Sequence, residues 1–470
     1  REGHTRVFLP RRYHELAPEL ELGHAGTEPP AHAELELAQL PVRLGLFSDG
    51  LFVVAATSEH EELVGRRVEG VGGVPIDDAL ARVGSTVAAG SPTRLHFLTP
   101  DRLTLLAVLR RAGLSDGLKG ARFDLGDGGG STTTVTLAAL ERGEVEWVGG
   151  PETGPLAERN PDEKAWFEVL PEHDAISVQV HELEAFPERP WAEFVRESLD
   201  AARSAGVGRY VLDLRANAGG NGSWVTPFVS GLSGSEFDRY GRLMVLIGGG
   251  TYSAAQMLVN QLERYTAVCF VGEPSGSPPT HFGDSRKIIL ENSGLTLRVS
   301  TLFWPNWLAG EFREATSAHV DVEPSSGDHF AGRDPVLAAA LAYEPPADVA
   351  GQVEDLLRRG KAQAGILRFL RHLTDPRTVD FQTESFVAAG HRLLDDGLTR
   401  VGRFVFVLVG DYHPASADAQ AGWGRAMELE GDPEAAARHY QRALALDPDH
   451  SAVRQALGRL QPTPEDPQDR

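Results

Sequence analysis

The sequence predicts a multi-domain α/β protein: a core with β/α crossovers, a smaller α+β module before it and an all-α repeat tail after it. Its 470 residues exceed the roughly 250–300 at which a single hydrophobic core stops growing. Strand-like and helix-like segments alternate between 209 and 271, and a C-terminal pattern recurs after 34 residues. The expected parts are an N-terminal segment (1–40), an α+β module (41–140), the core domain (160–345), a helical linker (346–383) and helical repeats (384–462).

Composition and charge exclude several classes of protein. Lys plus Arg total 45 and Asp plus Glu total 67, so the net charge is −22, which argues against nucleic acid or an anionic membrane as the main partner. The single cysteine, Cys269, excludes an internal disulfide framework and a Cys-based zinc cluster. The longest apolar runs are far shorter than the roughly 20 residues that span a bilayer. The histidines lack metal-ligand spacing, and we expect no metal and no cofactor.

The module at 41–140 has short strands, turns and one clear helix. Residues 51–55 and 67–71 have strand-like composition, Gly72 and Gly73 form a turn, and 75–83 follow as a helix with proline near its start. This order resembles a PDZ-like module, a fold that captures an extended peptide by adding it as a strand to a sheet edge. A small α+β domain without a ligand is the alternative.

The core domain alternates strands and helices. An apolar strand at 209–215 runs into a glycine-rich loop at 216–222. The following segments are a helix (224–232), a strand (243–247), a glycine turn (248–253), a helix (254–264) and a strand (267–271). This order implies right-handed crossovers over a mostly parallel sheet. In such sheets the chemistry lies beyond the carboxyl ends of the strands, which here means the two glycine-rich segments.

Ser253 lies where a strand turns into a helix. The backbone N–H groups and the positive end of the helix dipole favour negative charge there, as a developing oxyanion requires. The alternative is that Ser253 only caps the helix, a position that serine favours.

Three motifs carry a resemblance to a known family. They are Asp213-Leu-Arg-Ala-Asn-Ala-Gly-Gly220, Gly249-Gly-Thr-Tyr-Ser-Ala-Ala-Gln256 and Val271-Gly-Glu-Pro274, and together they resemble the tail-specific (carboxy-terminal processing) serine peptidases and their tricorn-type relatives. The segments 320–323 and 332–341 look like the family's closing part. The resemblance covers roughly 160–345 and implies a crossover core of the ClpP/crotonase-like peptidase type.

The resemblance also implies roles for individual residues. The serine that matches the family's nucleophile is Ser253, and the amides of Gly219, Gly220 and Ala254 match its oxyanion hole. A serine hydroxyl is a poor nucleophile until a neighbouring base takes its proton, so a base must also be present.

The identity of that base stays open. The tail-specific branch uses a lysine in a Gly-Glu-x-Thr-x-Gly-Lys strip, but here Pro278 stands in the lysine's place and the next lysine is Lys287. The tricorn-type branch uses a histidine ahead of the PDZ module, and Gly3-His4-Thr5-Arg6 resembles the end of that motif, which makes His4 the expected base. His281 is the alternative, and it could equally be a structural loop residue.

The resemblance to the tricorn-type branch also implies a carboxylate before Val320 that orients the histidine, and both Glu311 and Glu314 fit. Because the chain starts at Arg1, three residues before His4, we expect a segment that normally precedes the motif, and part of the site's wall, to be missing.

The C-terminal repeat has the tetratricopeptide period. Gly390, Gly397, Phe406 and Pro414 recur 34 residues later as Gly424, Gly431, Tyr440 and Pro448. An ordinary helical hairpin is the alternative. Two copies are fewer than the three usually needed for independent stability, so the repeats should lean on a neighbour and can bind a protein partner.

The function expected from these features is that of a serine endopeptidase-like protein that cleaves an extended polypeptide through an acyl-enzyme on Ser253. The first alternative is a catalytically inactive homologue that binds a peptide or other ligand, which the missing lysine favours. A third possibility makes the repeats the main function, as an interaction scaffold. The compartment, extracytoplasmic or cytoplasmic, stays open.

Overall fold

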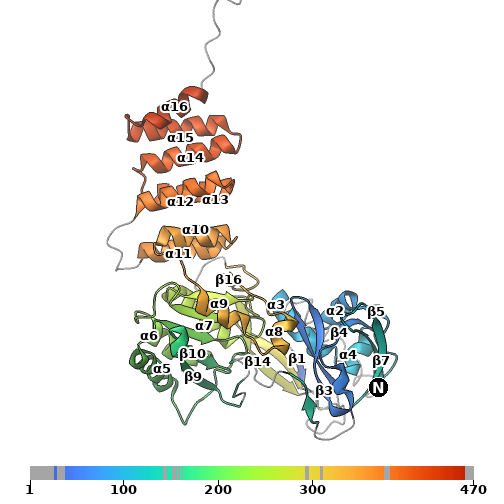
Figure 1. The fold of residues 1–470 in the computed structure, drawn as a ribbon. Helices are drawn as coiled ribbons and strands as arrows, with labels where there is room; N and C mark the ends of the chain where they lie inside the picture. The colour runs from blue at the N-terminus through green and yellow to red at the C-terminus, as the bar shows by residue number, and fades with distance from the viewer. Residues whose placement is uncertain are drawn as a thin grey trace, which may run out of the picture. The chain divides into compact units, whose positions relative to one another are not determined.

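The computed structural model describes residues 26–28, 38–140, 145–150, 156, 159–160, 162–289, 291, 296–306, 311–374 and 382–460 (Figure 1). The chain forms two compact units, Arg1–Tyr343 and Glu344–Arg470. The mixed α/β character of the first unit and the all-helical second unit confirm the predicted fold class. Within the described ranges, no helix is both long and apolar enough to cross a membrane.

The N-terminal part of the first unit is a small α+β module. Its sheet has the order β2-β3-β4-β6-β7, with β5 paired to β4 and β8 to β3. The strands are β2 (Val42–Phe47), β3 (Gly50–Thr57), β4 (Arg67–Val71), β5 (Val74–Pro75), β6 (Gly120–Gly126), β7 (Thr132–Ala138) and β8 (Trp147–Val148). The helices are η1 (Ser58–Leu63), α2 (Ile76–Gly84), α3 (Pro92–Arg102) and α4 (Leu106–Arg111).

These elements confirm the strands predicted at 51–55 and 67–71. Gly72 and Gly73 both have positive φ and form the turn between β4 and β5, as the sequence predicts. Alternate residues of β3, such as Leu51 and Val53, are buried in a separate hydrophobic core under the module's helices. The PDZ-like character of the module stays a prediction.

The core sheet of the first unit has the order β16-β13-β12-β11-β10-β9. The strands are β9 (Ala165–Leu170), β10 (Ala175–Val180), β11 (Arg209–Asp213), β12 (Leu243–Ile247), β13 (Cys269–Gly272) and β16 (Val320–Asp321). All neighbouring pairs are parallel except β9 with β10, which confirms the predicted mostly parallel sheet. Strands β10 and β12 are buried along their whole length, as expected for parallel strands covered on both faces.

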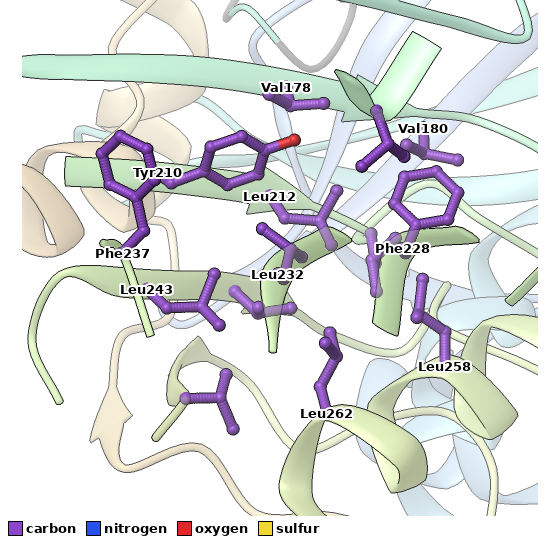
Figure 2. Close-up of a cluster of buried hydrophobic side chains, with 14 of the residues drawn as sticks. Val178, Val180, Tyr210, Leu212, Phe228, Leu232, Phe237, Leu243, Leu258 and Leu262 are labelled. Atoms are coloured by element: carbon purple, nitrogen blue, oxygen red, sulfur yellow. The ribbon is translucent and has the colours of Figure 1, made fainter. Parts of the chain in front are cut away.

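Three helices pack on this sheet: α5 (Trp191–Ala205), α6 (Val225–Leu232) and α7 (Ala254–Tyr265). Figure 2 shows part of the shared core, to which Leu212 of β11, Phe228 of α6 and Leu258 of α7 contribute. Each such side chain contributes roughly 1.5–3 kcal/mol when fully buried. This core holds the carboxyl ends of β11 and β12 in a fixed place, and both glycine-rich segments begin there.

The remaining elements of the first unit surround the sheet. A second sheet has the order β1-β15-β14, and short helices complete the set. The elements are β1 (Gly26–Glu28), β14 (His281–Ile289), β15 (Thr296–Trp304), η3 (Pro171–His173), η4 (Gly222–Trp224), α8 (Ser326–Phe330) and α9 (Pro335–Ala342).

The second unit is all-helical. Its helices are α10 (Val349–Arg358), α11 (Ala362–Thr374), α12 (Thr383–Asp395), α13 (Thr399–Tyr412), α14 (Ala417–Leu429), α15 (Pro433–Leu446) and α16 (Ser451–Leu460). The stretch at 347–365, which belongs to the expected helical linker, contains a break at Gly360, whose φ is 76°. Both flanking helices, α10 and α11, contribute buried residues to the core of this unit.

The packing explains the 34-residue period. A Cβ on Gly390 would lie 2.7 Å from the ring of Phe406, and a Cβ on Gly424 would lie 2.6 Å from the ring of Tyr440. Each repeat therefore has a glycine on its first helix because an aromatic ring of its second helix occupies the space of a side chain.

Candidate active site around Ser253

Ser253 has a strained backbone at the start of α7. Its φ is 55° and its ψ is −119°, a combination that residues with a Cβ rarely adopt. Strain of this kind costs on the order of 1–3 kcal/mol and clusters at active sites. The Ser253 side chain accepts no capping hydrogen bond from α7, although it occupies the N-cap position. The structure therefore rejects the alternative that Ser253 serves only as a helix cap.

The first amide of α7 lies directly beside this serine. Ala254 is buried, and no described residue accepts a hydrogen bond from its N–H group. Helix α7 has twelve residues, so its dipole adds positive potential at this end. The Ala254 amide is thus available to stabilise negative charge on an atom bonded to the Ser253 oxygen.

The glycine-rich loop after β11 lies against Ser253. A Cβ on Gly219 would be 2.7 Å from the Ser253 Cβ and 3.0 Å from the Ala254 nitrogen, so only glycine fits. The Gly219 N–H donates to Asn217 Oδ1 at 2.8 Å, which engages one of the three predicted oxyanion donors. Leu183 pairs with the Gly219 carbonyl and the Asn221 amide, and no described residue accepts from the Gly220 N–H. The available donors are therefore Gly220 and Ala254.

Asn217 is a residue whose role the sequence motif did not reveal. It is fully buried, its Nδ2 donates to the Val180 carbonyl at 3.0 Å, and its own carbonyl accepts from the Tyr252 amide at 3.0 Å. Asn217 thus joins the glycine loop, strand β10 and the Ser253 turn. Its place before the double glycine was the only available signal.

A buried cluster of charged side chains holds the start of the same loop in place. Arg215 Nη2 lies 2.6 Å from Asp213 Oδ2 and 2.7 Å from Asp334 Oδ2. Asp334 is the N-cap residue of α9. Burial disfavours the charge on Arg215, but the two carboxylates outweigh it and raise the pKa of the guanidinium. A Cβ on Gly250 would be 2.0 Å from the Arg215 carbonyl oxygen, so the Ser253 turn rests directly on this anchor.

The strip that holds a lysine in the resembling peptidases lies along the other side of the turn. The Gly276 amide donates to the Thr251 carbonyl at 2.9 Å, and Asn260 Nδ2 of α7 donates to the Pro279 carbonyl at 2.7 Å. Pro278, which stands in the lysine's place, lies between these two contacts in the chain. Its side chain carries no titratable group.

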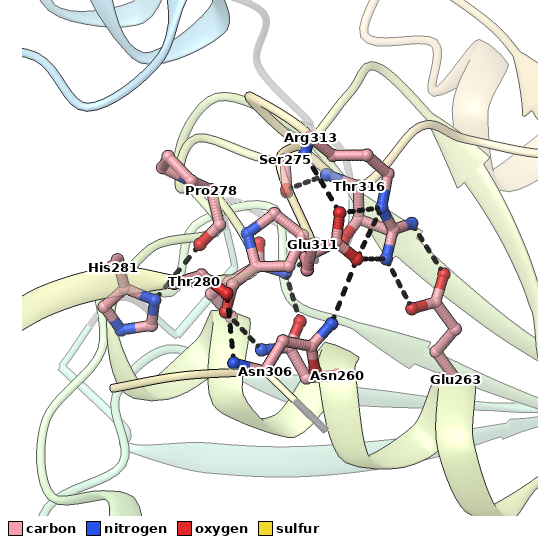
Figure 3. Close-up of polar contacts among 12 residues, drawn as sticks. Asn260, Glu263, Ser275, Pro278, Thr280, His281, Asn306, Glu311, Arg313 and Thr316 are labelled. Atoms are coloured by element: carbon pink, nitrogen blue, oxygen red, sulfur yellow. Dashed lines mark hydrogen bonds and ion pairs between the residues drawn. The ribbon is translucent and has the colours of Figure 1, made fainter. Parts of the chain in front are cut away.

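Of the candidate bases, His281 and Lys287 lie in the described part of the chain. His4 lies outside the described residues. His281, at the start of β14, is buried, and its Nδ1 donates to the Pro278 carbonyl at 3.1 Å (Figure 3). Burial lowers the pKa of His281, so the ring is neutral at pH 7 with Nε2 as its basic nitrogen. Lys287 is six residues further along β14, about 20 Å from His281 at the rise of a strand.

No base is hydrogen-bonded to the nucleophile within the described part of the chain. Among those residues, no His or Lys side chain is hydrogen-bonded to the Ser253 hydroxyl. The structure thus brings Ser253, Ala254 and the double glycine together, and it leaves the base as a prediction.

The two candidate carboxylates have different surroundings. The Glu311 side chain is buried, and it accepts hydrogen bonds from Arg313 and from Asn306 Nδ2 (Figure 3). Burial opposes ionisation of Glu311, but the bonds from Arg313 outweigh it and lower the pKa of the carboxyl. Glu314 is exposed. Since the Asn306 amide donates to Thr280 Oγ1, the Glu311 network reaches the residue before His281.

No group of three or more His, Cys, Asp or Glu side chains in the described ranges could hold a metal ion. The polar groups that the structure brings together around Ser253 are backbone amides and one hydroxyl. This set suits acyl transfer.

Comparison with known proteins gives one family match and several similar folds. A family model described as tetratricopeptide repeat matches residues 417–460, which confirms the predicted repeat there. None of the curated proteins compared with the chain is similar to it in sequence.

Several solved structures are similar to the chain at low sequence identity. A photosystem II D1 C-terminal processing protease is 14% identical, over 68% of this chain and 82% of its own, with a TM-score of 0.34. Mature CPAF complexed with lactacystin is 12% identical, over 78% and 90%, with a TM-score of 0.46. A putative S41 protease from Bacteroides fragilis is 14% identical, over 76% and 88%, with a TM-score of 0.32. At these values the residues of the chain itself have to support any function.

Proposed function

We propose that this protein is a serine-type peptidase that cleaves an extended polypeptide through an acyl-enzyme on Ser253. The observation that carries the proposal is the geometry of Ser253: a strained serine at a helix start that makes no cap bond and lies against a glycine loop. A serine kept only as a cap would use its side chain as an acceptor, and one kept only for packing would not need positive φ.

The proposed chemistry uses groups of this chain alone. The Ser253 Oγ attacks the scissile carbonyl carbon while an imidazole takes the hydroxyl proton. The carbonyl oxygen becomes negative and accepts hydrogen bonds from the Gly220 and Ala254 amides. The C–N bond then breaks, and the imidazolium protonates the departing amine. The imidazole next takes a proton from water as the water oxygen attacks the ester carbonyl, the bond from that carbon to Ser253 Oγ breaks, and the imidazolium returns the proton to Oγ.

His4 is the proposed base, with His281 as the alternative. The resemblance of Gly3-His4-Thr5-Arg6 to the tricorn-type motif supports His4. The neutral, buried ring of His281 beside Pro278 supports the alternative. Glu311 is the proposed orienting carboxylate because it is ionised, buried and linked to the His281 loop, whereas Glu314 is exposed.

A fluorophosphonate probe tests the proposal, because it reacts covalently with an activated serine. We expect labelling of the wild-type chain and none of the Ser253→Ala variant. Ser223→Ala is the matched control, since Ser223 is an exposed serine in η4, close to the glycine loop in sequence, and should label like the wild type. Labelling that persists in Ser253→Ala would contradict the proposal.

A non-catalytic peptide-binding protein is the second candidate, and one specific observation favours it. Proline occupies the position of the family lysine, and no described base is hydrogen-bonded to Ser253. Absence of labelling in a folded wild-type chain, together with saturable binding of an unfolded polypeptide, would support this candidate instead.

A further inference from the structure

The N-terminal module contributes a side chain to the turn that carries Ser253. Arg94, in the first turn of α3, donates from Nη1 to the Gly249 carbonyl at 3.1 Å. Its guanidinium carbon lies 4.4 Å from the ring centroid of Tyr252, the residue that precedes Ser253. One side chain therefore contacts both ends of the segment Gly249–Tyr252, although it is about 155 residues away in sequence.

The start of α3 is itself fixed to the core domain. Ser91 caps the helix by accepting the Arg94 amide at 3.1 Å, and its own hydroxyl donates to the Gly276 carbonyl at 2.9 Å. Ser91 is buried. The cap thus orients Arg94 and also attaches α3 to the strip on the other side of the turn.

Packing leaves no space between these segments. A Cβ on Gly249 would be 2.6 Å from the Phe97 Cβ and 2.8 Å from the Thr93 carbonyl oxygen. A Cβ on Gly276 would be 2.1 Å from the Gly249 carbonyl oxygen. The turn is therefore enclosed between α3 and the strip at 275–277, and only glycine allows both approaches.

The charge of Arg94 is not compensated by an acid. Among the described residues no carboxylate forms an ion pair with Arg94, and Tyr252 is the neighbour that favours its charged form. An uncompensated, partly buried guanidinium costs free energy that an apolar side chain of similar size would not. What the guanidinium adds here is the hydrogen bond to Gly249 and the flat contact with Tyr252.

We infer that Arg94 is a positioning residue for the nucleophile, which holds the Gly249–Tyr252 segment so that Ser253 keeps its strained, reactive backbone. The inference rests on the proposed function of Ser253. It makes the module a structural part of the candidate active site, and it predicts that loss of the Arg94 contacts lowers the reactivity of Ser253 without unfolding the protein.

The test compares Arg94→Ala and Arg94→Lys with Arg102→Ala in the full chain. Arg102 is an exposed arginine at the other end of α3 and serves as the matched control. Three quantities are measured: the rate of fluorophosphonate labelling, the hydrogen exchange of a peptide spanning 248–258, and the Tm.

We expect Arg94→Ala to label about tenfold more slowly than wild type, as the loss of one positioning hydrogen bond implies. Exchange should rise in the 248–258 peptide, with little change in Tm. Arg94→Lys should recover part of the rate, since an ammonium can donate to Gly249 but cannot stack flat on Tyr252. Arg102→Ala should behave as wild type. If Arg94→Ala does not fold, Tyr252→Leu, which removes the ring and keeps the arginine, replaces it.

Two results would overturn the inference: wild-type labelling and exchange in Arg94→Ala, or an equal loss of labelling in Arg94→Ala and Arg102→Ala. If no variant labels, including wild type, the proposed function fails. Even then, increased exchange at 248–258 confined to the Arg94 variants would support the positioning role, and unchanged exchange would refute it.

Discussion

At the scale of a single residue, the proposed chemistry depends on the backbone conformation of Ser253. Its positive φ turns the side chain away from the α7 amides, so the hydroxyl does not cap the helix. With this backbone, the Ser253 Cβ lies against Gly219, and the Ala254 amide stays available. A site that stores strain in this way should gain stability when the strain is removed.

Replacement of Ser253 by glycine tests that statement. Glycine adopts positive φ without a Cβ clash, whereas alanine keeps the strain. We expect Ser253→Gly to be more stable than Ser253→Ala by about 1 kcal/mol, after the entropy cost of glycine is subtracted. Chemical denaturation of the two variants measures the difference. An alanine variant that is the more stable of the two would show that the serine is not strained.

The pH dependence of labelling separates the two candidate bases. Only the neutral imidazole accepts a proton, so the rate rises with pH through the pKa of the base. Burial lowers the pKa of His281, so catalysis by His281 would give a midpoint below the ordinary value of roughly 6.5. A rising limb that is lost in His4→Ala and kept in His281→Ala identifies His4. The reverse pattern would exclude His4 as the base.

The sequence was sufficient to select Ser253 but not to exclude its role as a cap. Its position between a strand and a helix can be read from hydrophobic pattern and glycine content, whereas φ and ψ depend on tertiary contacts. No sequence pattern indicated the role of Arg94, because only the packing of the module brings its partners Gly249 and Tyr252 close to it. Side chains that act across such distances are invisible to local patterns.

At the scale of the secondary-structure elements, the turn at Gly248–Gly250 connects β12 to α7 and sets where the helix begins. Gly250 does not have positive φ, so its requirement for glycine comes from the approach of the Arg215 carbonyl alone. We expect Gly250→Ala to destabilise the protein by about 2–4 kcal/mol because backbone must move to admit the methyl group.

Gly117 offers the matched control for this substitution. A Cβ there would meet nothing within 4 Å, and its φ is not positive either, so Gly117→Ala should leave stability nearly unchanged. Denaturant midpoints of both variants provide the comparison. Equal effects of the two substitutions would mean that the turn tolerates a side chain.

Sequence patterns predicted the strands and helices of the core well, because buried parallel strands are continuous apolar runs with glycine at their ends. They predicted a helical linker at 346–383, which the structure divides at Gly360 into α10 and α11. A glycine inside a helical pattern does not by itself reveal a stop, and the αL conformation of Gly360 follows from packing of α11 back on α10.

At the scale of the whole molecule, every described residue of the candidate site belongs to the first compact unit, Arg1–Tyr343. The second unit has its own hydrophobic cores and a tetratricopeptide match. We therefore expect removal of 344–470 to leave the rate of fluorophosphonate labelling unchanged. The separate 344–470 fragment should show a helical far-UV spectrum and a cooperative thermal transition. A shortened chain that stays folded but no longer labels would show that the second unit completes the site.

The most direct test of the central claim is to locate the modified residue. After treatment with a fluorophosphonate, the intact chain should gain the mass of one adduct, and peptide mapping should place it on Ser253. The adduct should be absent when the protein is denatured before treatment, since the reactivity depends on the folded turn. A folded wild-type chain that gains no adduct, or one modified at another serine, would contradict the account.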